Sequence, residues 1–101
     1  MSLPLLVALL AIAMEPGLSV SDLAERIGAP QQTASRYSAF LQGRYEIPGD
    51  NTSLFVHTPF VTLEISPVDP RRRALTLTRH GQAWLDRFFQ HLGSGIQGGG
   101  A

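Results

Sequence analysis

The first apolar segment of the chain, residues 3–14, has hydrophobic side chains at nearly every position and is rich in helix formers. Pro16 and Gly17 end the helix that this segment predicts, over residues 3–15. A helix that is apolar on all sides has to be covered on all sides, and a small domain rarely covers a terminal helix completely. We therefore predict that part of this helix forms a subunit interface; the alternative is a central core helix in a monomer.

Two short amphipathic segments follow, separated by a tight turn. Ser21 is the predicted N-cap of the first, whose apolar positions lie three and four residues apart up to Ile27. Gly28 suits a left-handed C-terminal residue, and Pro30 suits the start of the next helix, which we expect to run to about Gln42. The tight turn between the two helices is typical of a helix-turn-helix, here over residues 21–43.

The second half of the chain changes period. Residues 44–59 contain a strong turn signal at Pro48-Gly49 and predict either a small hairpin or an ordered loop. Residues 60–78 alternate between apolar and polar on both sides of a turn, which predicts an antiparallel hairpin with one buried face. Thr78 is the predicted cap of a last helix over residues 79–92, and the glycine-rich residues 93–101 are expected to form a flexible tail.

This order of elements predicts a mainly α domain with a small antiparallel β-hairpin (α+β), a winged helix-turn-helix, over residues 1–92. In a helix-turn-helix the second helix enters the major groove of DNA. Its polar face here is able to present donors and acceptors to base edges and phosphates, although such a face is often only solvated. The residues of that helix predicted to bind DNA are Gln31, Gln32, Thr33, Ser35, Arg36 and Ala39.

The charge of the chain has to be interpreted by position, because the 101 residues carry a formal net charge of zero. Zero net charge argues weakly against a polyanionic partner. However, Arg71, Arg72 and Arg73 stand together at the predicted hairpin tip, where they are able to reach phosphates or the minor groove. The alternative is a charged tip that keeps the hairpin edge from pairing with other chains. Asp69 is expected to organise this turn, and we include it in the DNA-binding tip.

Other classes of function find little support. The chain has no cysteine, which excludes disulfides and thiolate chemistry. His57, His80 and His91 stand singly, with no nucleophile arrangement and no phosphate-binding glycine loop near them. We predict no enzymatic activity, no cofactor and no metal. The first apolar segment is shorter than the ~20 residues that cross a bilayer, so we expect no membrane partner and a cytoplasmic protein.

The sequence resembles the multiple-antibiotic-resistance-regulator (MarR) family of bacterial winged-helix proteins, both around residues 18–36 and in the Asp69-Pro-Arg-Arg-Arg segment that leads to Gly81. The resemblance implies a homodimer on pseudo-palindromic double-stranded DNA, with residues 31–36 in the recognition helix and residues 69–73 in the wing. It also implies a dimer interface made by the terminal helices. The interface residues expected on this basis are Leu3, Leu5, Leu6, Leu9, Leu10, Trp84, Phe88, Phe89 and Leu92.

The sequence departs from the family pattern in several places. Residues 44–59 are an insertion, the wing tip is shorter, and Ser38 stands where a large apolar residue is commoner, so Tyr37 or Phe40 is expected to fill the core instead. The short terminal helices leave little room for a ligand pocket. They favour a phage-like or mobile-element repressor without a small-molecule effector, and whether an effector exists is left open.

We thus predict a sequence-specific DNA-binding transcriptional regulator that acts as a repressor. The competing hypothesis is a winged helix used only for protein–protein contact, with Tyr45, Phe55 and Phe60 of the insertion region as its docking surface.

Overall fold

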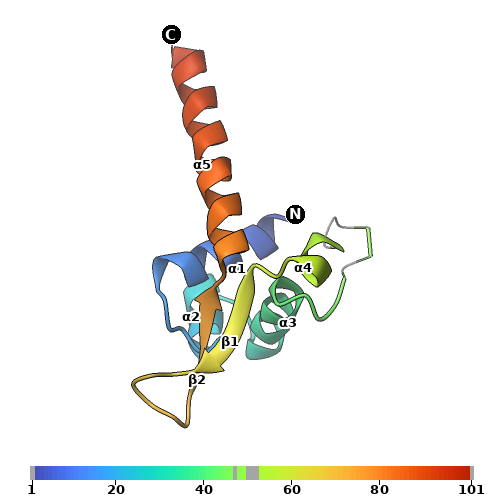
Figure 1. Cartoon of the computed structure of the whole chain (residues 1–101), viewed down its shortest axis with the longest axis vertical. Helices are drawn as coiled ribbons and strands as arrows, with labels where there is room; N and C mark the ends of the chain where they lie inside the picture. The colour runs from blue at the N-terminus through green and yellow to red at the C-terminus, as the bar shows by residue number, and fades with distance from the viewer. Residues whose placement is uncertain (1, 47, 50–52, 101) are drawn as a thin grey trace.

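The computed structural model describes residues 2–46, 48–49 and 53–100. Within these residues, five helices and a two-stranded sheet form the domain, and the longest helix extends away from the rest (Figure 1). The mainly α winged helix-turn-helix predicted from the sequence is confirmed. In chain order the elements are α1 (Leu3–Met14), α2 (Val20–Ile27), α3 (Gln31–Leu41), α4 (Ser53–His57), β1 (Val61–Ile65), β2 (Arg73–Leu77) and α5 (Arg79–Gly100).

Helix α1 lies in the centre of the core and not only at an edge. Leu5 and Leu9 are fully buried, with Ala8 and Ile12 on the same face, and they contact the helix-turn-helix and the sheet. The prediction that Leu5 and Leu9 belong to a dimer interface is therefore wrong, because their side chains are already enclosed within one chain. Leu3, Val7 and Met14 are the exposed apolar side chains of this helix.

Helix α2 begins two residues earlier than predicted. Its N-cap is Ser19, not Ser21, and a capping box closes the helix end. The backbone N–H of Asp22 donates to Ser19 Oγ (3.1 Å), and the N–H of Ser19 donates to Asp22 Oδ2 (3.2 Å). This reciprocal pair satisfies two donors that a bare helix start leaves open. At the other end, Gly28 takes the predicted left-handed conformation (φ 66°) and directs the chain into α3.

The core side of α3 is built around small residues. Ala34 and Leu41 are fully buried, and Ser38 is 3% exposed with its hydroxyl donating to the carbonyl of Ser35 (2.8 Å). Tyr37 and Phe40 pack against the core beside them, as the sequence predicted.

The insertion contains a helix, so the expected small hairpin is wrong for residues 53–57. Phe55 of α4 is 1% exposed and packs edge-on against Phe60, with ring centroids 4.7 Å apart. A helix allows Phe55 to reach the core while the backbone N–H of Phe60 donates to the carbonyl of Leu41 (3.0 Å). Because Phe55 and Phe60 are both buried, they do not form the docking surface suggested for the insertion; Tyr45 is 60% exposed.

The hairpin is antiparallel, with Val61 opposite Leu77 and Ile65 opposite Arg73. Burial decreases toward the tip: Val61 is fully buried, whereas Ile65 is 69% exposed. The middle of β2 is fixed to the chain before α2, since the N–H of Leu75 donates to the carbonyl of Leu18 (2.7 Å). The wing is therefore held beside the helix-turn-helix by backbone hydrogen bonds.

Helix α5 starts as predicted, with the N–H of Gly81 donating to Thr78 Oγ1 (3.1 Å), but its backbone is helical to Gly100. The end predicted at Leu92 is therefore eight residues too early. Each further helical residue adds one hydrogen bond, which favours continuation once a helix has formed, whereas each glycine costs about 1 kcal/mol relative to alanine. The flexibility of the glycine-rich residues stays a prediction.

Candidate nucleic-acid interface

The outer face of α3 carries four of the six residues predicted to bind DNA from this helix. Gln31, Gln32, Ser35 and Arg36 are exposed, and Thr33 is half-buried beside them. The helix begins at Gln31, directly after Pro30 as N-cap, so both glutamines stand in its first turn, where free backbone N–H groups favour anions. This face combines amide donors and acceptors with one guanidinium group.

Ala39 does not belong to this face. Its side chain is only 8% exposed, and its carbonyl accepts the N–H of Arg44 (3.0 Å) as the chain leaves the helix. Ala39 follows Ser35 by four residues on the helix, but it is buried where Ser35 is exposed. The prediction that Ala39 contacts DNA is therefore wrong.

Beside α3 the surface is hollowed. Thr33 and Arg36 line a depression of about 830 Å³ together with Tyr37, Phe40 and Tyr45. The rings of Phe40 and Tyr45 meet edge to face, with centroids 6.1 Å apart. The insertion thus lies next to α3 and borders Arg36.

The wing tip is a turn fixed by its own side chains. Ser66 Oγ accepts the backbone N–H groups of Val68 (3.2 Å) and Asp69 (3.3 Å), and Asp69 Oδ1 accepts the N–H of Arg71 (3.0 Å). The N–H of Ser66 donates to the carbonyl of Arg72 (2.8 Å) and closes the loop. Asp69 therefore organises the turn, as predicted, but it does so through a backbone N–H and not through an arginine side chain.

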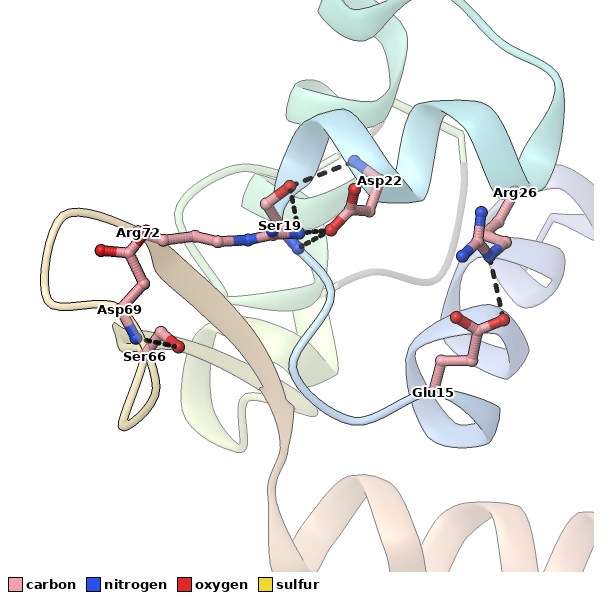
Figure 2. A network of polar contacts seen from close by, with 7 residues as sticks. All are labelled: Glu15, Ser19, Asp22, Arg26, Ser66, Asp69 and Arg72. Carbon is pink, nitrogen blue, oxygen red and sulfur yellow. Dashed lines mark hydrogen bonds and ion pairs between the residues drawn. The ribbon is translucent and has the colours of Figure 1, made fainter.

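The three arginines of the wing have different environments. The Arg72 guanidinium forms an ion pair with Asp22 Oδ2 and donates to Ser19 Oγ (3.3 Å), so it binds the capping box at the start of α2 (Figure 2). This contact joins residues 53 positions apart and connects the wing to the helix-turn-helix. The side chains of Arg71 and Arg73 are exposed, and within the described part of the chain neither has an ion-pair partner.

The sequence analysis predicted Ser21 as the N-cap and gave Ser19 no role, so the part that Ser19 and Asp22 play in holding the wing was missed. The spacing of a serine three residues before an acid does predict a capping box. No local pattern predicts that Arg72 reaches it, because the contact depends on how the hairpin packs.

The two exposed surfaces, on α3 and on the wing, lie in the same half of the molecule. In Figure 1 the wing tip and α3 are at the end opposite to the C-terminal end of α5. Arg36 on α3 and Arg71 and Arg73 on the wing therefore give this end exposed positive charge on a chain that is neutral as a whole.

Across residues 2–46, 48–49 and 53–100, no group of three or more histidine, aspartate or glutamate side chains is placed to hold a metal ion. Within these ranges no helix combines the length and the hydrophobicity needed to cross a bilayer.

No protein-family model matches the chain, and no curated protein matches it. Solved structures match its fold. BpsR of Bordetella bronchiseptica, whose DNA binding is regulated by 6-hydroxynicotinic acid, aligns with a TM-score of 0.67 at 18% identity over 97% of this chain. A MarR-like transcriptional regulator of Thermotoga maritima aligns with a TM-score of 0.69, also at 18% identity over 97% of this chain. The transcriptional repressor CouR, solved on a 23-mer DNA duplex, aligns with a TM-score of 0.59 at 25% identity over 80% of this chain.

These alignments show that the chain has the winged-helix fold of MarR-like regulators, as its sequence suggested. The chain spans 60% of the length of the first two structures and 47% of CouR.

Proposed function

We propose that this protein is a sequence-specific double-stranded DNA-binding transcriptional regulator. The observation that carries the proposal is the pair of exposed polar and cationic surfaces on one end of the molecule, α3 and the wing, held together by the contact of Arg72 with Asp22. A helix with exposed amides and a guanidinium group fits the major groove, and exposed arginines on a neighbouring hairpin fit phosphates or the minor groove. CouR, which has the same fold, was solved on a DNA duplex.

In this proposal Gln31 and Gln32 contact base edges, Ser35 contacts phosphate, and Arg36 contacts guanine or phosphate. Thr33 lies at the margin of this surface. Arg71 and Arg73 supply phosphate contacts from the wing, whereas Arg72 and Asp69 keep the wing in position. This division corrects the expectation that all three arginines act alike.

The regulator acts as a homodimer in this proposal. Phe89 is 52% exposed and Leu92 is 47% exposed on the part of α5 that extends from the domain, and Leu3 and Val7 are exposed on α1. Leu6, Leu10, Trp84 and Phe88 are half-buried and lie on the same two helices. Two copies would place two recognition helices on two half-sites of a pseudo-palindrome, and we propose that the bound dimer represses transcription by occupying the operator.

The test is selection of bound duplexes from a random pool, followed by fluorescence anisotropy over a series of salt concentrations. The selected sites should be pseudo-palindromic, and affinity should fall steeply with salt because phosphate contacts release counterions. Changing Arg71 and Arg73 together to glutamine should lower the slope of log K against log salt by about two per subunit.

Arg87→Gln is the matched control, since this exposed arginine of α5 lies outside the proposed DNA-binding surface on α3 and the wing. It should leave the slope unchanged. If micromolar duplex at low salt causes no anisotropy change with the unaltered protein, the proposal is refuted. The protein–protein module suggested as the rival function would then be the better description.

A further inference from the structure

The wing tip has an apolar surface that neither the core nor the phosphate contacts explain. Val68 is 91% exposed and stands between Pro67 and Pro70, both of which are also exposed. An isolated apolar residue on a surface is ordinary. Here, however, the apolar residues occupy the apex of a hairpin that also carries the exposed arginines Arg71 and Arg73, while the carboxylate of Asp69 is engaged by the backbone N–H of Arg71.

The position of Val68 is fixed before any partner binds. Its backbone N–H donates to Ser66 Oγ, and the following residues are held by Asp69 as described above. The Arg72 contact with α2 orients the whole hairpin relative to the recognition helix. Because the backbone of the tip is held in this way, little of the chain has to be ordered on binding, so more of the apolar contact of Val68 is retained as affinity.

A tip that served only to protect the hairpin edge would not need this residue. Protection of an edge is achieved by charge, proline or a bulge, and Arg71, Pro67 and Pro70 already provide charge and proline. An exposed valine adds apolar surface, which is unfavourable in water and favourable only where another surface covers it.

We propose that Val68 is a specificity-determining residue that packs on the floor of the minor groove beside each half-site, where it favours A·T over G·C pairs. This rests on the proposed function, DNA binding. The minor groove distinguishes these pairs mainly by the N2 amino group of guanine, which projects from its floor. A methyl group packed on that floor would cover the amino group and leave its donor without a hydrogen bond. Apolar side chains inserted into the minor groove are an established way to contact DNA there.

The experiment uses an operator obtained by random-pool selection, with its flanking pairs replaced one at a time. Each A·T pair on the wing side is changed to G·C and, separately, to inosine·C. Inosine lacks the N2 amino group but keeps the major-groove edge of guanine, so any difference between the two duplexes comes from the minor groove. We expect one or two positions where G·C weakens binding about five- to tenfold and inosine·C restores it.

Two variants then test whether the Val68 side chain causes the weaker binding of G·C than of inosine·C. Val68→Ser should bind G·C and inosine·C duplexes equally at these positions, with the salt slope of the unaltered protein. Ile65→Ser is the matched control, since Ile65 is an exposed apolar residue of the same hairpin at 69% exposure but stands in β1 and not at the apex. It should keep the preference.

The inference is overturned if the unaltered protein binds its operator but shows no difference between G·C and inosine·C at any flanking position. It is equally overturned if Val68→Ser keeps the preference, because a narrow A·T-rich groove attracting Arg71 would then be the cause. A failure of the proposed function is distinct, since no duplex from the pool would then bind at all.

Discussion

At the scale of single residues, Arg72 differs from the arginines on either side of it. Its guanidinium group is paired with Asp22, so the pair carries no net charge to a phosphate. Changing Arg72 to glutamine should lower DNA affinity about three- to tenfold, because the wing loses its link to α2 and Asp22 is left as an uncompensated negative charge near the DNA. The salt slope should stay close to that of the unaltered protein, whereas Arg71→Gln should lower it by about one per subunit.

The effect of Arg72→Gln on folding should be small. The Arg72 and Asp22 side chains are 44% and 30% exposed, and ion pairs in contact with solvent contribute at most about 1 kcal/mol. Urea unfolding of the variant checks this figure. A salt slope reduced as much by Arg72→Gln as by Arg71→Gln would show that Arg72 contacts phosphate directly.

A second residue-scale prediction concerns pH. Arg26 Nε donates to Glu15 Oε1 (2.9 Å), and this hydrogen bond, helped by the charge of Arg26, lowers the pKa of Glu15 below its ordinary value of 4.5. A carboxylate with a lowered pKa stabilises the fold above its unfolded pKa and loses that contribution as pH falls through the folded value. The free energy of unfolding should therefore decrease below about pH 4.5 in part through this pair.

The measurement is an NMR titration of the Glu15 carboxyl carbon. Arg26→Gln should return the pKa of Glu15 toward 4.5, and Arg87→Gln, which changes an arginine on another helix, should not affect it. A Glu15 pKa at or above 4.5 in the unaltered protein would contradict the hydrogen bond.

At the scale of elements, the junction between α3 and the insertion depends on Gly43. This residue has φ 81°, and a Cβ at its position would overlap the carbonyl oxygen of Phe55. Gly17 has a similarly positive φ of 97°, but a Cβ there would meet open space. Gly17→Ala should therefore lower the free energy of unfolding by about 1–2 kcal/mol, because alanine is strained in this backbone conformation.

Gly43→Ala should lower the free energy of unfolding by at least about 1 kcal/mol more than Gly17→Ala does, because α4 also has to move away from α3. Chemical denaturation of the two variants compares them directly. Equal decreases in the free energy of unfolding of the two variants would mean that α4 does not pack on the end of α3.

The elements that the sequence predicted correctly are those determined by a local pattern of residues. The alternation of residues 61–65 and 73–77 predicted the hairpin, and Gly28 predicted the turn of the helix-turn-helix. Phe55 was misjudged, because a short apolar segment fits a strand or a helix equally and only packing against Phe60 decides. Ala39 was misjudged for a related reason, since the period of α3 places it with the exposed Ser35, whereas its burial depends on tertiary packing.

At the scale of the whole molecule, the distribution of charge makes the proposed binding of DNA compatible with a chain that is neutral as a whole. Asp22 lies close to the proposed DNA surface, but Arg72 neutralises it. Glu15, at the end of α1, is neutralised by Arg26 in the same way. Arg36, Arg71 and Arg73 are exposed at the proposed DNA surface, and within the described residues none of them is paired with an acid. In the proposed complex the positive charge available to DNA is therefore local.

The last prediction concerns assembly. Trp84 and Phe88 stack with ring centroids 5.3 Å apart, and Phe89 and Leu92 follow them as exposed apolar residues on the extended part of α5. An apolar stripe on a helix that stands away from its own core is favourable only when another surface covers it. Changing Phe89 and Leu92 together to aspartate should therefore convert a dimer at micromolar concentration into a monomer, as measured by sedimentation velocity.

Val56→Asp is the control for this pair, since Val56 is 45% exposed on α4, away from α5. It should leave the protein a dimer. The aspartate pair should also weaken operator binding far more than binding to a single half-site, because only a dimer engages two half-sites on one duplex. A double variant that still sediments as a dimer would place the subunit interface on another surface, such as the exposed side of α1 with Leu3, Val7 and Met14.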